Sequence, residues 1–85
     1  MNKTKLKICG IKNINTLQCC IANNVDFFGM IFYEKSPRHI SFKKALNLLK
    51  YSRERKISSV GVFVNKNIED LNQILKKLTF NLIQL

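Results

Sequence analysis

FFGMIFY, at residues 27–33, is an apolar run with almost no interruption. A run of this length and character is typical of a strand that is covered on both faces, which is the usual condition of a parallel sheet. Three other segments are also short, apolar and bounded by turn-forming residues, and they lie at 6–9, 60–64 and 82–85. The sequence therefore predicts four strands, with their faces covered by other elements.

The segments between these strands carry apolar residues at helical spacing. Each of the three expected helices is preceded by a residue that favours the N-cap position, namely Asn13, Ser41 and Asn67. Strands that alternate with helices predict right-handed crossovers and a parallel sheet. The fold class is therefore α/β, either an open doubly wound sheet or part of a (β/α)8 barrel. No G-x-G-x-x-G and no P-loop follows the first strand, which argues against a dinucleotide-binding unit.

The chain has 85 residues, whereas a complete (β/α)8 barrel takes roughly 250. One domain at most fits this length, and its core is expected to be marginal. The net charge is +10, and the lysines are spread along the chain rather than gathered in one block. This distribution favours a generally solvated basic surface. A non-catalytic basic module that binds nucleic acid is the alternative.

Three cysteines are present, two of them adjacent at Cys19 and Cys20, and no C-x-x-C occurs. The sequence therefore gives no support for a metal site or a disulfide framework, and it favours a reducing compartment. No signal-peptide pattern follows Met1, and no apolar stretch is long enough to span a membrane. A cytoplasmic protein without membrane contact is expected.

Chemistry in α/β folds is expected where the strands end, at their carboxyl edge. Cys9 lies at the tip of the first strand. It shares a face with Lys7, and this face should point to the interior while Leu6 and Ile8 pack under the helices. An ammonium near a thiol favours the thiolate, which can act as a base or nucleophile. Gly10 would leave room for a substrate. A small buried apolar role for Cys9 fits the residues equally well.

The second strand is followed by a loop, residues 33–40, that contains Ser36-Pro37-Arg38-His39. Ser36-Pro37 favours an extended turn, which could hold Arg38 over the strand tips. A guanidinium placed there can bind a carboxylate or a phosphate in bidentate fashion. A solvated surface arginine is the alternative.

Together these segments resemble phosphoribosylanthranilate isomerase, the barrel enzyme of tryptophan biosynthesis. The resemblance rests on five motifs that follow the order of that family: KICGI (7–11), GMIFY (29–33), KSPR (35–38), VGVFVN (60–65) and IQL (83–85).

The resemblance implies an Amadori rearrangement, in which N-(5-phosphoribosyl)anthranilate becomes 1-(2-carboxyphenylamino)-1-deoxyribulose 5-phosphate. It also implies that Cys9 is the general base, with Lys7 supporting it, and that Arg38 and Gly10 bind the substrate. No cofactor and no metal are implied. His39 replaces the aromatic residue usual in the family and is expected to be a solvated loop residue.

The family pattern continues past Gln-Leu with His-Gly, whereas this sequence ends at Leu85. In the family, the general acid and the phosphate site come from later strands. Residues 1–85 are therefore expected to form a single partial barrel domain, with about four strands and three helices, that is truncated within its fourth strand. Such a chain should be inactive alone. Self-association, or a complementing C-terminal half-barrel, would cover its open edges.

Overall fold

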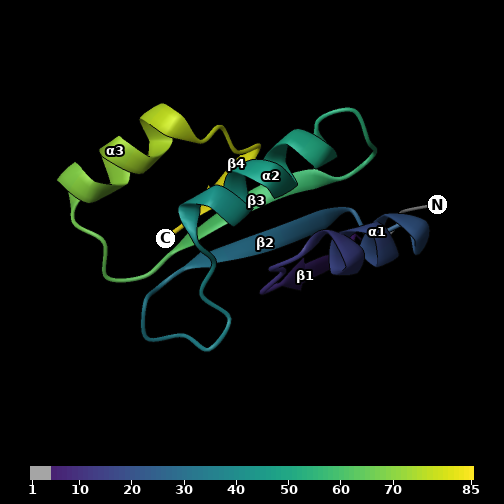
Figure 1. Cartoon of the computed structure of the whole chain (residues 1–85), viewed down its shortest axis with the longest axis horizontal. Coiled ribbons are helices and arrows are strands. Elements are labelled where there is room, and N and C mark those ends of the chain that lie inside the picture. The colour runs from purple at the N-terminus through teal and green to yellow at the C-terminus, as the bar shows by residue number, and fades with distance from the viewer. Residues whose placement is uncertain (1–4) are drawn as a thin grey trace.

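The computed structural model describes residues 5–85 as one parallel sheet covered by helices (Figure 1). The strands are β1 (Lys7–Cys9), β2 (Phe27–Phe32), β3 (Ser58–Phe63) and β4 (Leu82–Gln84), and they lie in the order β1-β2-β3-β4. Every neighbouring pair is parallel. The helices are α1 (Ile14–Ala22), α2 (Phe42–Ser52) and α3 (Ile68–Lys77). The predicted arrangement of four parallel strands and three helices is confirmed.

The helices begin where local sequence chemistry places them. The side chains of Asn13, Ser41 and Asn67 each accept a hydrogen bond from the backbone N–H three residues later, at 2.8, 3.3 and 2.8 Å. Each bond satisfies a donor that has no partner within the helix. The first turn of α3 also carries Glu69 and Asp70, which interact favourably with the positive end of the helix dipole.

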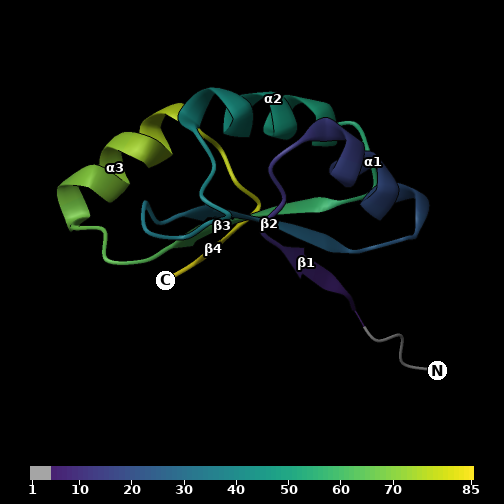
Figure 2. The same ribbon diagram turned by 60° about the horizontal axis from the view of Figure 1, so that its bottom comes forward.

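All three helices lie on one side of the sheet (Figure 2). The core sits between the layers, because alternate residues of β2 point toward the helices and are buried there: Phe28, Met30 and Phe32. Three aromatic rings pack at one end of this core. The rings of Phe32 and Phe63 stack at 5.0 Å, and Phe80 meets both edge-on at 5.6 and 5.9 Å. A sheet with helices on one face is the arrangement of a (β/α) barrel segment rather than of a doubly wound fold.

The other face of the sheet is concave. A side-chain hydrogen bond crosses it from β1 to β4, with Lys7 Nζ donating to Gln84 Oε1. The two residues are 77 positions apart in sequence and belong to the two edge strands. Because two strands separate β1 from β4, this contact shows that the sheet curls toward itself, as it does in a barrel wall.

The edge strands differ from the prediction that the strands are covered on both faces. Leu6 and Ile8, expected beneath the helices, are 53% and 42% exposed, and Leu82 and Ile83 of β4 are 52% and 44% exposed. Within residues 5–85 each edge strand has a hydrogen-bonded neighbour on one side only, so its side chains lack contacts of the kind that bury β2.

The third strand begins earlier than its apolar run predicts, at Ser58 instead of Val60. Ser59 is buried, and its backbone N–H and hydroxyl both donate to Asn81 Oδ1, at 2.8 and 3.0 Å. The backbone N–H of Asn81 donates back to Ser59 Oγ at 3.0 Å. These partners satisfy the polar side chain, so the strand continues through a serine that sequence pattern alone assigns to a loop.

None of the helices within residues 5–85 has both the length and the apolar character needed to cross a membrane.

Candidate functional site

The predicted site lies at the carboxyl ends of β1 and β2. Cys9 is the last residue of β1, is half-buried, and is paired in register with Gly29 at the middle of β2. A Cβ built on Gly29 would lie 3.0 Å from Cys9 Sγ and 3.5 Å from Lys7 Cε. The two side chains therefore share the concave face, as their spacing predicts, and lie against the same glycine.

Lys7 has a partner that the sequence did not indicate. Its Nζ donates to Gln84 Oε1, so its ammonium is held toward β4 at the far side of the concave face. The supporting role predicted for Lys7 at Cys9 is not tested by this contact and stays a prediction.

Gly10 takes a left-handed backbone conformation, with φ +83°. A Cβ at this position would lie 2.5 Å from Arg38 Cδ and 3.0 Å from Arg38 Nε. The Arg38 side chain therefore passes directly over Gly10, one residue after Cys9. Gly10 thus brings Arg38 and Cys9 to the same corner of the sheet, and the substrate-binding role predicted for Gly10 stays a prediction.

The Arg38 loop is held by short-range hydrogen bonds. Ser36 N–H donates to the Tyr33 carbonyl at 2.9 Å, and Arg38 N–H donates to Ser36 Oγ at 3.1 Å. A longer contact, from Lys12 Nζ to the Pro37 carbonyl at 3.4 Å, joins this loop to the turn after β1. These contacts hold the loop in a compact turn, in agreement with the predicted position of Arg38 over the strand tips.

His39 is not the solvated residue that the sequence predicts. It is half-buried, and its backbone forms a parallel bridge with Ile31 of β2. The next residue extends this pairing, because Ile40 N–H donates to the Ile31 carbonyl at 3.0 Å. This part of the loop therefore folds back against β2, and the pairing brings His39 with it.

Gly10→Ala tests how Gly10 and Arg38 fit together. We expect a loss of about 1–3 kcal/mol in the free energy of unfolding, because an L-residue is strained at this φ and its Cβ collides with Arg38. Urea denaturation measures the loss. In an Arg38→Ala background the collision is removed while the backbone strain stays, so the same substitution should cost less. Equal losses in the two backgrounds would show that Arg38 does not lie over Gly10.

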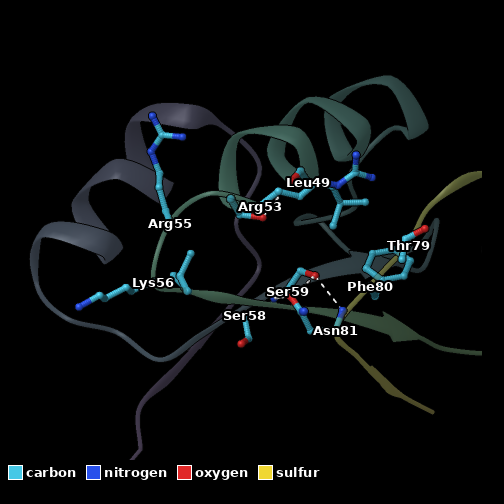
Figure 3. A pocket seen from close by; sticks show the side chains of 11 residues that line it. Leu49, Arg53, Arg55, Lys56, Ser58, Ser59, Thr79, Phe80 and Asn81 are labelled. Carbon is cyan, nitrogen blue, oxygen red and sulfur yellow. Dashed lines mark hydrogen bonds between the residues drawn. The ribbon is translucent and has the colours of Figure 1, made fainter.

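A cavity of about 350 Å³ lies at the opposite end of the strands (Figure 3). Figure 3 shows Ser59 and Asn81 joined by hydrogen bonds along its wall. Of its basic residues, Arg55 stacks on the ring of Tyr51 at 3.6 Å and donates to the Tyr51 carbonyl at 2.6 Å. The cavity is lined by none of the predicted site residues. Within residues 5–85, no cluster of three or more His, Cys, Asp or Glu side chains could hold a metal ion.

Comparison with known proteins assigns the chain to a family. Residues 6–85 match the family described as N-(5'-phosphoribosyl)anthranilate (PRA) isomerase. The chain belongs to the PRA isomerase family. The fold and the motif resemblance predicted from the sequence are thereby confirmed.

Individual PRA isomerases agree with this assignment. The chain is 42% identical over 81 residues to the N-(5'-phosphoribosyl)anthranilate isomerase of Campylobacter jejuni, a match that covers 95% of this chain and 40% of that protein. The crystal structure of phosphoribosylanthranilate isomerase from Thermotoga maritima superposes with a TM-score of 0.88 at 31% identity, covering 98% of this chain and 40% of that one. The chain thus spans about 40% of the length of the PRA isomerases it matches.

A further PRA isomerase structure contains a ligand. It holds reduced 1-(o-carboxyphenylamino)-1-deoxyribulose 5-phosphate, and this chain superposes on it with a TM-score of 0.87 at 31% identity, covering 98% of this chain and 42% of that one. The ligand of that protein combines an aromatic carboxylate with a sugar phosphate.

Among the predicted residues, the structure brings together Cys9, Gly10 and Arg38, and it directs the ammonium of Lys7 toward β4. Sequence reasoning missed Gly29 and Gln84 as neighbours of this site. Gly29 carried one usable signal, because a glycine within a buried strand often marks a close approach of another group. Gln84 carried none, since its contact with Lys7 depends on the curl of the sheet.

Proposed function

We propose that this chain forms the part of a PRA isomerase that carries the general base and the carboxylate anchor. The reaction is the rearrangement of N-(5-phosphoribosyl)anthranilate to 1-(2-carboxyphenylamino)-1-deoxyribulose 5-phosphate. One observation carries the proposal: in a chain of this family, Arg38 lies over Gly10, beside the thiol-bearing tip of β1.

The reaction needs an acid that protonates the ring oxygen as the sugar opens, and a base that removes a proton from the adjacent carbon of the resulting imine. In this proposal Cys9 is the base, with Lys7 supporting it, and Arg38 binds the anthranilate carboxylate. The partner is a small phosphorylated substrate, and no cofactor takes part. The aromatic carboxylate in the ligand of the related isomerase is the group that a guanidinium binds in bidentate fashion.

The acid and the phosphate site are assigned to strands beyond those described here. The exposed apolar side chains along both edge strands, Leu6, Ile8, Leu82 and Ile83, are the surfaces that further strands would cover. These strands would lie on the same polypeptide or in a complementing half-barrel, and self-association would cover the same edges. Residues 1–85 would then be one part of a larger barrel domain.

The experiment compares the 85-residue chain with a protein in which the remaining strands are present. Conversion of N-(5-phosphoribosyl)anthranilate is followed by chromatographic separation of substrate and product. We expect turnover only when the remaining strands are present, because loss of a general acid typically lowers a rate by about 10²–10⁴. Turnover by the 85-residue chain alone would contradict the assignment of the acid to another part of the barrel.

Arg38→Met is expected to raise KM about 10- to 100-fold in the complete barrel, with a smaller change in kcat. A charge-assisted hydrogen bond contributes about 1.5–3 kcal/mol, and the carboxylate is present in both the ground state and the transition state. Steady-state kinetics provide the measurement. Lys35→Met is the matched control, since Lys35 is an exposed cation of the same loop. If both variants raise KM equally, Arg38 acts through general charge and not as an anchor.

The proposed compartment is the cytoplasm, because all three cysteines are free thiols, which fits a reducing environment. The alternative of a nucleic-acid-binding module rests on the net charge of +10 alone. It stays a prediction, and salt-dependent RNA binding would test it.

A further inference from the structure

Gly29 lies at the centre of the site, although no chemistry falls to it. It pairs with Cys9 on one side and with Val60 on the other, in the middle of β2. Its carbonyl accepts two hydrogen bonds from the turn after β1, from Gly10 N–H and from Ile11 N–H, both at 3.0 Å. The carbonyl of Gly29 therefore holds the two residues that follow Cys9, Gly10 and Ile11, against β2.

The backbone conformation of Gly29 does not require glycine. Gly10 is the glycine with positive φ in the described residues, and Gly29 lies within a regular strand. Glycine weakens a strand interior, because it adds backbone entropy to the unfolded chain and has no side chain to pack. A glycine at this position therefore points to a packing requirement.

That requirement is the space occupied by Cys9. A Cβ on Gly29 would lie 3.0 Å from Cys9 Sγ and 3.4 Å from Cys9 Cα. Carbon atoms at their optimal separation are about 3.5–4.0 Å apart, and sulfur is larger than carbon. We propose that Gly29 is a positioning residue, which leaves the concave face open so that the Cys9 thiol can lie over β2. This inference rests on the proposed function only where it treats Cys9 as the general base.

The thiol, rather than β2, is the group that would move. Gly29 is buried between two hydrogen-bonded neighbours, and Val60 beside it is only 4% exposed. β1 is an edge strand, and among the described strands it pairs with β2 alone. A methyl group at position 29 would therefore displace the Cys9 side chain outward, away from β2 and toward solvent.

Gly61 provides a matched control on the neighbouring strand. A Cβ there would lie 2.8 Å from Phe63 Cε2 and 3.1 Å from Phe80 Cε2, within the core between sheet and helices. Gly61→Ala therefore also crowds a buried strand glycine, but on the face opposite to Cys9.

Thiol labelling separates the two effects in the 85-residue chain. Iodoacetamide labelling is followed by mass spectrometry that resolves the three cysteines. Exposed Cys19 is the reference for reagent activity. Cys20 reports opening of the fold, because it is buried, and burial, with the neighbouring Cys19 as a second cause, raises the pKa of its thiol.

In Gly29→Ala we expect labelling of Cys9 to become at least about threefold faster relative to Cys19, with Cys20 unchanged. In Gly61→Ala we expect Cys9 and Cys20 to change together or not at all. Unchanged or slower labelling of Cys9 in Gly29→Ala would overturn the proposal. So would a parallel rise at Cys9 and Cys20, because it would show that Gly29 only maintains the fold.

A second measurement tests the same contact between position 29 and the Cys9 sulfur through stability. The urea midpoint is compared for Gly29→Ala in the wild-type and in the Cys9→Ala backgrounds. We expect a smaller loss when the sulfur is absent, and equal losses would overturn the proposal. Neither measurement involves turnover, so both are independent of the proposed function. That function fails separately, if Cys9→Ala retains turnover in the complete barrel.

Discussion

Cys9→Ala is expected to lower kcat by about 10²–10⁴ in a protein that carries this chain and the remaining strands of its barrel. Proton removal by Cys9 occurs in the transition state, whereas Arg38 is the proposed anchor of the bound substrate, so KM should change little. A loss in kcat with constant KM indicates that an interaction of the transition state is missing. Steady-state kinetics with N-(5-phosphoribosyl)anthranilate provide the measurement.

Two control variants test whether the loss in kcat is specific to the Cys9 thiol. Cys19→Ala removes an exposed thiol from α1 and should leave kcat unchanged. Cys9→Ser keeps the shape of the side chain but should be nearly as inactive as Cys9→Ala, because a hydroxyl is too weak a base near neutral pH. A Cys9→Ala variant with wild-type kcat would assign the proton transfer to another residue.

Phe63→Ala is expected to have the largest effect on stability, a loss of about 3–5 kcal/mol in the free energy of unfolding. Phe63 is 3% exposed, and its ring stacks on Phe32 and meets the edge of Phe80. Truncation removes two aromatic contacts and leaves a cavity between β3 and the helix layer. Because domains are stable by only about 5–15 kcal/mol, a loss of this size can unfold a chain of 85 residues.

Phe42→Ala is the control for the loss of a phenyl ring. Phe42 lies at the start of α2, is 41% exposed, and has the ammonium of Lys77 5.7 Å from its ring centroid. Its truncation should cost less than that of Phe63, about 1–2 kcal/mol, since less buried surface is lost. Urea midpoints by circular dichroism compare the two variants. Similar losses in both would show that the aromatic cluster adds nothing to the core beyond general apolar area.

The helices and the strand order were predictable because they depend on interactions between near neighbours. Asn13, Ser41 and Asn67 cap their helices through hydrogen bonds to residues three positions away. The residues that determine where each helix begins therefore lie within one helical turn of each other. The apolar run of β2 predicted a strand covered on both faces, and the alternation of strands with helices predicted the parallel sheet. The proximity of Cys9 to Arg38 followed from the same logic, since both stand at the carboxyl ends of adjacent strands.

Contacts between distant residues escaped prediction, because they depend on register and on the curl of the sheet. The early start of β3 requires Asn81 to bind Ser59 from 22 residues away, and the contact of Lys7 with Gln84 spans 77 residues. Which side chains lie against Gly10 and Gly29 also depends on contacts between distant residues. The sequence predicted open space at Gly10, but only the tertiary structure shows Arg38 over Gly10 and the Cys9 thiol over Gly29. Local chemistry thus determined which elements form and in which order, whereas packing between elements decided which side chain occupies each space.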